Sequence, residues 1–92
     1  MVRWLLRSVT DLENVFEYIS TNNPEAARSE INQILDTVGL LDSNPSMGRP
    51  GRVPGTRELV IAGTPYIVAY RAKRRSIEIL KVLHGAQKWT DI

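Results

Sequence analysis

The feature that most constrains the fold is a stretch rich in proline and glycine, residues 45–56, in the middle of the chain. It holds three prolines, three glycines and two arginines in twelve residues, which predicts a loop. Before it, apolar residues recur with the spacing of helices, and after it they form short runs typical of strands. The loop therefore predicts a helical half followed by a sheet half, and it is too short to link two domains.

The first half begins with a predicted strand. Residues 2–6 form a short apolar run that includes Val and Trp. A helix is expected next, with Ser8 or Thr10 as its N-cap, because hydroxyl side chains accept hydrogen bonds from the first free N–H groups of a helix. Its apolar stripe consists of Leu12, Val15, Phe16 and Ile19.

A second helix is predicted to start at Asn23 and Pro24. Asn is a good N-cap, and Pro fits the first helical position, where its missing N–H is not needed. The helix should end near residues 42–44, because Pro45 disfavours a helical residue before it. Its apolar face consists of Ala27, Ile31, Ile34, Leu35, Val38 and Leu41. The short connection predicts an antiparallel helical hairpin.

The second half predicts three strands, residues 57–61, 66–73 and 76–83, joined by turns at 62–65 and 74–75. Turns this short make antiparallel hairpins. The middle strand is apolar at both parities, as expected where both of its sides are covered. The fold class is therefore α+β, in the order β-α-α-β-β-β, with a helical hairpin packed on a small, mainly antiparallel sheet. Residues 1–92 are expected to form a single domain.

Charge is divided unevenly between the two halves. Residues 1–48 carry three arginines against seven acidic residues, a net charge of −4, and residues 49–92 carry nine basic residues against three acidic ones, a net charge of +6. The basic excess indicates a face for an anionic partner, either nucleic acid or an acidic protein segment. Basic strands and acidic helices that merely offset each other are the alternative.

Several function classes are disfavoured. The chain has no cysteine and one histidine, and no acidic cluster has metal-ligand spacing, so neither a metal nor a cofactor is expected. No apolar run reaches the roughly 18 residues of a membrane span. The N-terminus does not resemble a signal peptide. A cytoplasmic protein is expected.

Polar side chains on or beside the predicted sheet are the candidate site. Arginine suits phosphate, Tyr and Trp stack on unpaired bases, and His titrates near neutral pH. Such a set could cleave RNA without metal, with a base, an acid and arginines around the charged transition state. Its members are Arg49, Arg52, Arg57, Glu58, Tyr66, Tyr70, Arg71, Lys81, His84 and Trp89.

Structural roles explain some of these residues equally well. Arg57 and Glu58 could belong to a cross-strand set of ion pairs, and Tyr66 and Tyr70 could be core aromatics with hydroxyls at the rim. Strand parity places Lys81 and His84 on opposite faces unless a bulge intervenes, so both cannot join one site.

The order and spacing of short motifs over nearly the whole chain resemble the RelE/ParE superfamily of toxins. The helical hairpin carries Asp11-Leu12, Tyr18-Ile19 and Asn23-Pro24-Glu25-Ala26-Ala27. The rest carries Asn44-Pro45, Gly48-Arg49, Gly55-Thr56-Arg57-Glu58-Leu59, Tyr66-Ile67-Val68-Ala69-Tyr70-Arg71 and Ile79-Leu80-Lys81-Val82-Leu83-His84.

This resemblance implies a toxin of a bacterial type II toxin–antitoxin module, held inactive in a hetero-oligomer with its cognate antitoxin. RelE-like members cleave mRNA in the ribosome, and ParE-like members inhibit DNA gyrase. RelE-like nucleases place an arginine near the start of the middle strand, where this chain has Pro65-Tyr66. That departure favours the ParE-like subgroup.

Two alternatives remain at this point, an mRNA endonuclease and a non-toxic binding module on the same scaffold. If the chain is a ribonuclease, the expected catalytic residues are Arg57, Glu58, Arg71 and His84. The residues expected to bind the target or the antitoxin are Arg49, Arg52, Tyr66, Tyr70, Lys81 and Trp89.

Overall fold

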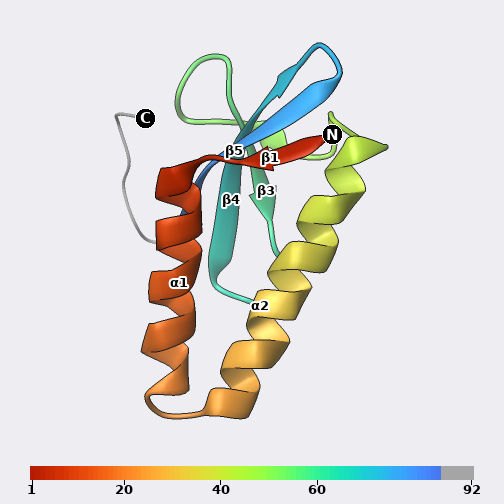
Figure 1. Cartoon of the computed structure of the whole chain (residues 1–92). Coiled ribbons are helices and arrows are strands. Elements are labelled where there is room, and N and C mark those ends of the chain that lie inside the picture. The colour runs from red at the N-terminus through yellow and green to blue at the C-terminus, as the bar shows by residue number, and fades with distance from the viewer. Residues whose placement is uncertain (86–92) are drawn as a thin grey trace.

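Two helices cover one face of a five-stranded sheet in the computed structural model, which describes residues 1–85 (Figure 1). The sheet order is β1-β5-β4-β3-β2. Among the described strands, only β1 runs parallel to its neighbour β5; the other pairs are antiparallel. This architecture confirms the predicted α+β fold. The elements are β1 Val2–Trp4, α1 Leu6–Ser20, α2 Pro24–Gly39, the 3-10 turn η1 Leu40–Asp42, β2 Arg49–Pro50, β3 Arg57–Val60, β4 Tyr66–Lys73 and β5 Ser76–His84.

Helix α1 begins earlier than predicted, and neither expected cap is used. Its N-cap is Leu5, which makes no side-chain capping bond, and Ser8 lies buried inside the first turn. The backbone N–H of Leu5 donates to the carbonyl of Ile79 at 3.1 Å. The chain therefore turns from β1 directly into the helix, and pairing with β5 decides where the helix starts.

Helix α2 begins as predicted. The side-chain oxygen of Asn23 accepts a hydrogen bond from the N–H of Ala26 at 3.0 Å, and Pro24 is the first helical residue. The helix ends at Gly39 and continues as η1 to Asp42, before Pro45. Local sequence thus determines both ends of this helix.

The main core lies between the helices and the sheet. Ile34 and Val38 of α2 pack there against Tyr70 and Ile79 of the sheet, all at most 1% exposed. Two residues of the predicted apolar stripes remain exposed: Phe16 is 40% exposed and Leu35 is 41% exposed. The predicted stripes were therefore wider than the buried faces of these short helices.

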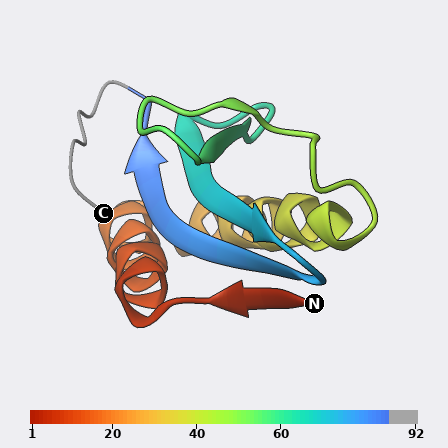
Figure 2. The same cartoon turned by 90° about the horizontal axis from the view of Figure 1, so that it is seen from above.

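The predicted loop at residues 45–56 contains a short strand and covers the second face of the sheet (Figure 2). Arg49 and Pro50 pair with Glu58 and Arg57 of β3, so two residues of the predicted loop form a strand that the sequence did not indicate. Val53 packs against a small cluster of Ala69, Leu80 and Leu83. Residues 67–70 of β4 are consequently buried, as predicted for a strand covered on both sides.

A bulge in β5 changes the parity of that strand. Tyr70 is opposite Ile79 and Ala69 is opposite Lys81, which leaves Leu80 as the extra residue. Leu80 consequently joins the cluster under the loop, whereas Val82 joins the main core. Because the bulge precedes Lys81, it does not bring Lys81 and His84 to the same face.

Candidate functional site

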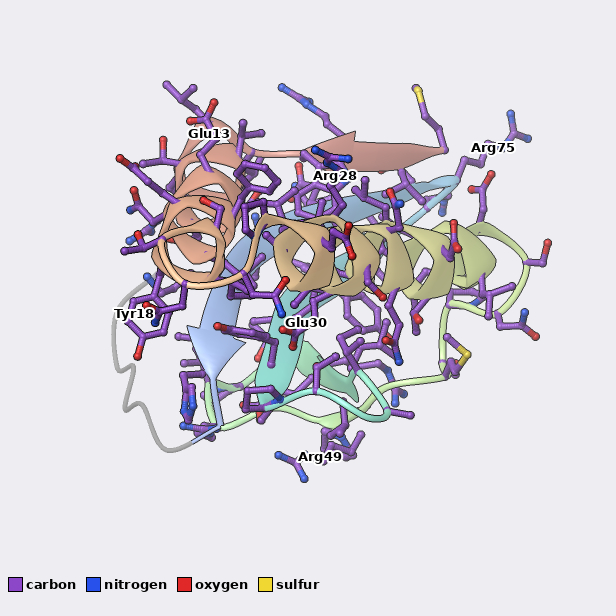
Figure 3. The ribbon with its side chains drawn as sticks, turned by 90° about the horizontal axis from the view of Figure 1, so that it is seen from below. Glu13, Tyr18, Arg28, Glu30, Arg49 and Arg75 are labelled. Carbon is purple, nitrogen blue, oxygen red and sulfur yellow. The ribbon has the colours of Figure 1, made fainter. Side chains whose placement is uncertain are left out.

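Polar side chains gather at three places, two of which lie on opposite faces of the sheet. The first is the segment 49–52 with Glu58, here called the arginine loop. Figure 3 shows Arg49 on the far side of the sheet from the helices.

Neither of the two described helices could span a membrane.

Glu58 is the centre of the arginine loop. It is 1% exposed, and its carboxylate accepts a hydrogen bond from the backbone N–H of Arg52 at 2.9 Å. The guanidinium groups of Arg49 and Arg52 lie 3.3 Å from its two oxygens, while their side chains remain 55% and 36% exposed. Glu58 therefore orients two arginines that still present N–H donors to solvent.

Side chains of the sheet also hold the residues that come just before the arginine loop. The buried hydroxyl of Tyr70 donates to the carbonyl of Pro45 and accepts from the N–H of Gly48, both at 2.8 Å. Arg57 donates to the carbonyl of Gly48, also at 2.8 Å. Tyr70 is thus a core aromatic whose hydroxyl ties the segment to the sheet, one of the two roles expected from the sequence.

The second place is a groove between the helices and the end of the sheet. It has a volume of about 550 Å³. Its apolar wall is formed by Val15 and Ile19 of α1 and Val82 of β5, and its polar wall includes Asp11, Tyr18, Glu30, Tyr66 and His84. Figure 3 shows Tyr18 on α1 and Glu30 on α2, and both side chains line the groove.

Tyr66 lines the groove together with Glu30 and Tyr18. Burial raises the pKa of the Tyr66 hydroxyl above its ordinary value of 10.0, and the charge of Glu30 and the neighbouring Tyr18 raise it further. The rings of Tyr66 and His84 meet edge to face, with centroids 5.9 Å apart. No lysine or arginine of the described chain lines this groove.

Asp11 closes one side of the groove. Only three residues of β5 pair with β1, so the rest of this edge of β5 has no neighbouring strand in the described structure. At this edge the backbone N–H of Val82 donates a hydrogen bond to the carboxylate of Asp11 at 3.1 Å. The ammonium of Lys81 lies 3.8 Å from the same carboxylate. Lys81 is therefore an ion-pair partner of Asp11 and does not line the groove.

The third place is the far end of the β4–β5 hairpin. Arg71 donates two hydrogen bonds to Glu78, at 2.7 and 3.0 Å, and Lys73 lies 3.4 Å from the same oxygen. These bonds from Arg71 lower the pKa of Glu78 against the opposing effect of burial, and Lys73 lowers it further.

The structure does not bring the four expected catalytic residues together. His84 pairs with Tyr66 at one end of β4, and Arg71 follows five residues later, roughly 17 Å along the strand. Glu58 and Arg71 are each held in ion pairs. Among the residues expected to bind a partner, Arg49 and Arg52 share a surface, Tyr66 lies in the groove, and Trp89 is outside the described residues.

Residues of α1 and α2 in the groove were not expected from the sequence. Asp11, Val15 and Tyr18 lie four and then three positions apart, a spacing that places them on one helical face and could have indicated a shared site. The contribution of Glu30 from the second helix had no such signal. Within residues 1–85, no group of three or more His, Cys, Asp or Glu side chains is placed to hold a metal ion.

Comparison with known proteins gives consistent matches. The chain matches the family described as ParE toxin of type II toxin-antitoxin system, parDE, over residues 2–89. It is 42% identical over 91 residues to the protein Y4kP of Sinorhizobium fredii. The aligned region covers 99% of this chain and 94% of that protein. A structure of the chromosomal ParDE TA system from P. aeruginosa matches with a TM-score of 0.78 and 30% identity, over 88% of this chain and 90% of the other.

Proposed function

Because the chain belongs to the family of ParE toxins of type II toxin–antitoxin systems, we propose that it arrests growth by binding DNA gyrase. A ParD-type antitoxin encoded beside it holds it inactive. The action is stoichiometric binding, and no bond in the target is cleaved.

The observation that carries this proposal is how the candidate nuclease residues are used in the fold. A metal-independent ribonuclease needs a base, an acid and cationic groups around one phosphate. Here Glu58 is buried between two arginines, Arg71 is bound to Glu78, and His84 lies at the opposite end of β4 from Arg71. This arrangement favours a binding protein over a nuclease.

The arginine loop is the surface that we assign to the target. Arg49 and Arg52 are oriented by Glu58 and remain partly exposed, and the segment is tied down at Gly48 and Pro45. A preorganised cationic surface loses little conformational entropy on binding and suits carboxylates of an acidic protein segment. Tyr70, whose hydroxyl ties this segment to the sheet, is fully buried, so it offers no stacking surface for bases.

The test is a supercoiling assay with the purified chain and purified gyrase. We expect inhibition at stoichiometric concentrations, and weaker inhibition when Arg49 and Arg52 are both changed to Gln. The matched control is Arg28→Gln, which removes an exposed arginine of α2 on the opposite side of the molecule from Arg49 (Figure 3).

Two outcomes would overturn the proposal. Rapid cutting of reporter mRNA on induction, with normal supercoiling, would establish a nuclease. Normal growth on induction without antitoxin would establish a non-toxic binding module.

A further inference from the structure

The free end of the β4–β5 hairpin concentrates positive charge that the proposed function does not use. Pairing of the two strands ends at Lys73, so Arg74 and Arg75 form the turn itself, and both are exposed. Figure 3 shows Arg75 at the outer edge of the molecule, away from Arg49 of the arginine loop. Four of the five residues from 71 to 75 are basic and are here called the basic turn: Arg71, Lys73, Arg74 and Arg75.

Strand β1 adds a further arginine to this surface. Arg3 lies opposite Glu78, which in turn lies opposite Arg71. Since neighbouring strands are about 4.8 Å apart, Arg3 and Arg71 flank β5 at a separation of roughly 10 Å. The residues on either side of Arg3 pack against the main core, so Arg3 points to the same face as Arg71. Glu78 is paired with Arg71 and Lys73, but their side chains remain 39% and 53% exposed.

The residues of the turn itself are not neutralised within the molecule. Neither Arg74 nor Arg75 forms an ion pair or a side-chain hydrogen bond within residues 1–85. Asp42 lines a small cavity with Lys73 and Arg75, but its carboxylate is bound to the amino group of Met1. The basic turn and Arg3 therefore set five positive charges against two negative ones, those of Glu78 and Asp42.

The backbone of Arg75 indicates that its side chain is used. Its φ is 62°, in the left-handed region that favours glycine, and it is the one non-glycine residue of the described chain with a positive φ. Glycine at this position would relieve the strain. Strained residues persist where their side chains serve a function, so an arginine here favours a role in binding.

We propose that the basic turn and Arg3 bind the phosphate backbone of duplex DNA without sequence specificity. Guanidinium and ammonium groups bind phosphates, and such contacts supply the affinity of non-specific DNA binding. No residue from 71 to 76 is aromatic, and the neighbouring Tyr70 is fully buried, so no ring is offered to unpaired bases. The same segment has no apolar side chain larger than that of Ala72, which disfavours a protein interface.

This site goes beyond the proposed function, because it needs no gyrase and leaves the arginine loop free for its protein target. The experiment measures binding of the purified full chain to a fluorescent DNA duplex of random sequence, by anisotropy at several salt concentrations. We expect binding at about 50 mM salt that weakens steeply as the salt concentration is raised.

The first variant changes both Arg74 and Arg75 to Gln. It should weaken binding at least about tenfold at low salt, because two phosphate contacts are lost. The slope of log affinity against log salt concentration should fall by about 2 for the same reason. The matched control changes Arg49 and Arg52 to Gln, which removes the same charge from another surface and should change the DNA affinity far less.

Single substitutions separate binding from folding. Arg75→Gly suits the backbone angle, so it should not lower the melting temperature, yet it should weaken DNA binding. Glu78→Gln should strengthen DNA binding, because it removes the carboxylate that holds Arg71 and Lys73. Glu13→Gln changes the net charge equally on an exposed part of α1 and should leave the affinity unchanged (Figure 3).

Several outcomes overturn the inference. Equal loss of affinity in the two double variants would show that only net charge matters. Tighter binding of a single strand than of the duplex would show that bases stack elsewhere on the chain. Displacement of the duplex by poly-glutamate at equal charge would make the site one for an acidic protein.

The same preparations separate this inference from the proposed function. A chain that inhibits gyrase but does not bind the duplex overturns the inference alone. A chain that binds the duplex but does not inhibit gyrase overturns the proposed function alone.

Discussion

The two faces of the sheet are attached to their covering layers by different kinds of contact. On the helix face, Ile34, Val38 and Ile79 are packed in an apolar core at most 1% exposed. On the loop face the apolar cluster is small, and polar contacts at Tyr70 and Glu58 hold the segment.

This difference determines how folding and binding are related on each face. In the groove, the charged residue Glu30 lies on a helix whose attachment depends on apolar neighbours, so its charge can be changed with little effect on the core. In the arginine loop, the buried carboxylate that holds the segment also orients Arg49 and Arg52. A change at Glu58 therefore alters stability and the binding surface together.

The largest effect is expected from Gly48→Ala. A Cβ atom at this position would lie 2.7 Å from the Cε1 atom of Tyr70 and 2.8 Å from its hydroxyl oxygen. Because that ring is fully buried, we expect the free energy of unfolding to fall by about 3 kcal/mol, the upper part of the range for overpacking. Chemical denaturation measures it.

Gly39→Ala is the control for this prediction. Gly39 has helical backbone angles, and a Cβ there meets nothing within 4 Å. The substitution should stabilise the fold by roughly 0.5–1 kcal/mol, the difference in helix propensity. Equal effects of the two substitutions would show that the loop is not held by close contact with Tyr70.

A smaller loss of stability is expected from Glu58→Gln. The amide keeps an oxygen for the N–H of Arg52 but loses the charge that holds both guanidinium groups, which should lower the free energy of unfolding by about 1–2 kcal/mol. Whether this substitution weakens or strengthens gyrase inhibition decides between two mechanisms. If the positions of the arginines matter, inhibition weakens; if only positive charge matters, it strengthens.

Glu78→Gln provides the comparison for Glu58→Gln. It also removes one negative charge, but from the pair with Arg71 and Lys73 at the end of the β4–β5 hairpin. We expect gyrase inhibition to be unaffected. A similar weakening by both variants would contradict a specific role for the arginine loop.

In the groove, Glu30→Gln should lower the pKa of Tyr66 without returning it to the ordinary value, because burial is the larger cause of its rise. Absorbance or NMR titration of the tyrosines measures this. Since the pKa of folded Tyr66 lies above that of the unfolded chain, stability is lost as pH rises through it, and Glu30→Gln should reduce that loss. An unchanged pKa would show that Glu30 does not act on the groove.

The smallest effect is expected at the hairpin end. Arg71→Gln should raise the pKa of Glu78 towards its ordinary value, because hydrogen bonds from Arg71 are the main cause of its lowering. A lowered pKa means that the pair stabilises the fold above the pKa of unfolded Glu and that this contribution is lost as pH falls through the folded value. Carbon NMR of the carboxyl group measures the shift, and added salt should diminish it.

Lys73→Gln serves as the comparison, since each effect of Lys73 on the pKa of Glu78 is smaller than that of the hydrogen bonds from Arg71. It should raise that pKa less than Arg71→Gln does. The reverse order would show that unspecific positive charge, and not the two hydrogen bonds from Arg71, controls this carboxylate.

The candidate site shows what sequence reasoning could reach. The residue types were found, and the alternative of a cross-strand ion pair at Glu58 was close, since its partner Arg49 lies opposite on β2. The pairing of Glu58 with residues nine and six positions earlier could not be derived, because it depends on how the segment 45–56 crosses the edge of the sheet. The groove combines α1, α2 and β5, and no local pattern connects these elements.

The sequence by itself determined the elements and their order. The cap at Asn23, the strands β3 to β5 and the mainly antiparallel sheet all follow from hydrophobic spacing and turn residues, which act over a few neighbouring positions. Only the tertiary structure decided the start of α1 beside β5, the pairing of Arg49 with β3 and the bulge at Leu80. These features depend on contacts between distant segments, whose free energies outweigh the small local preferences for a cap, a loop or a regular strand.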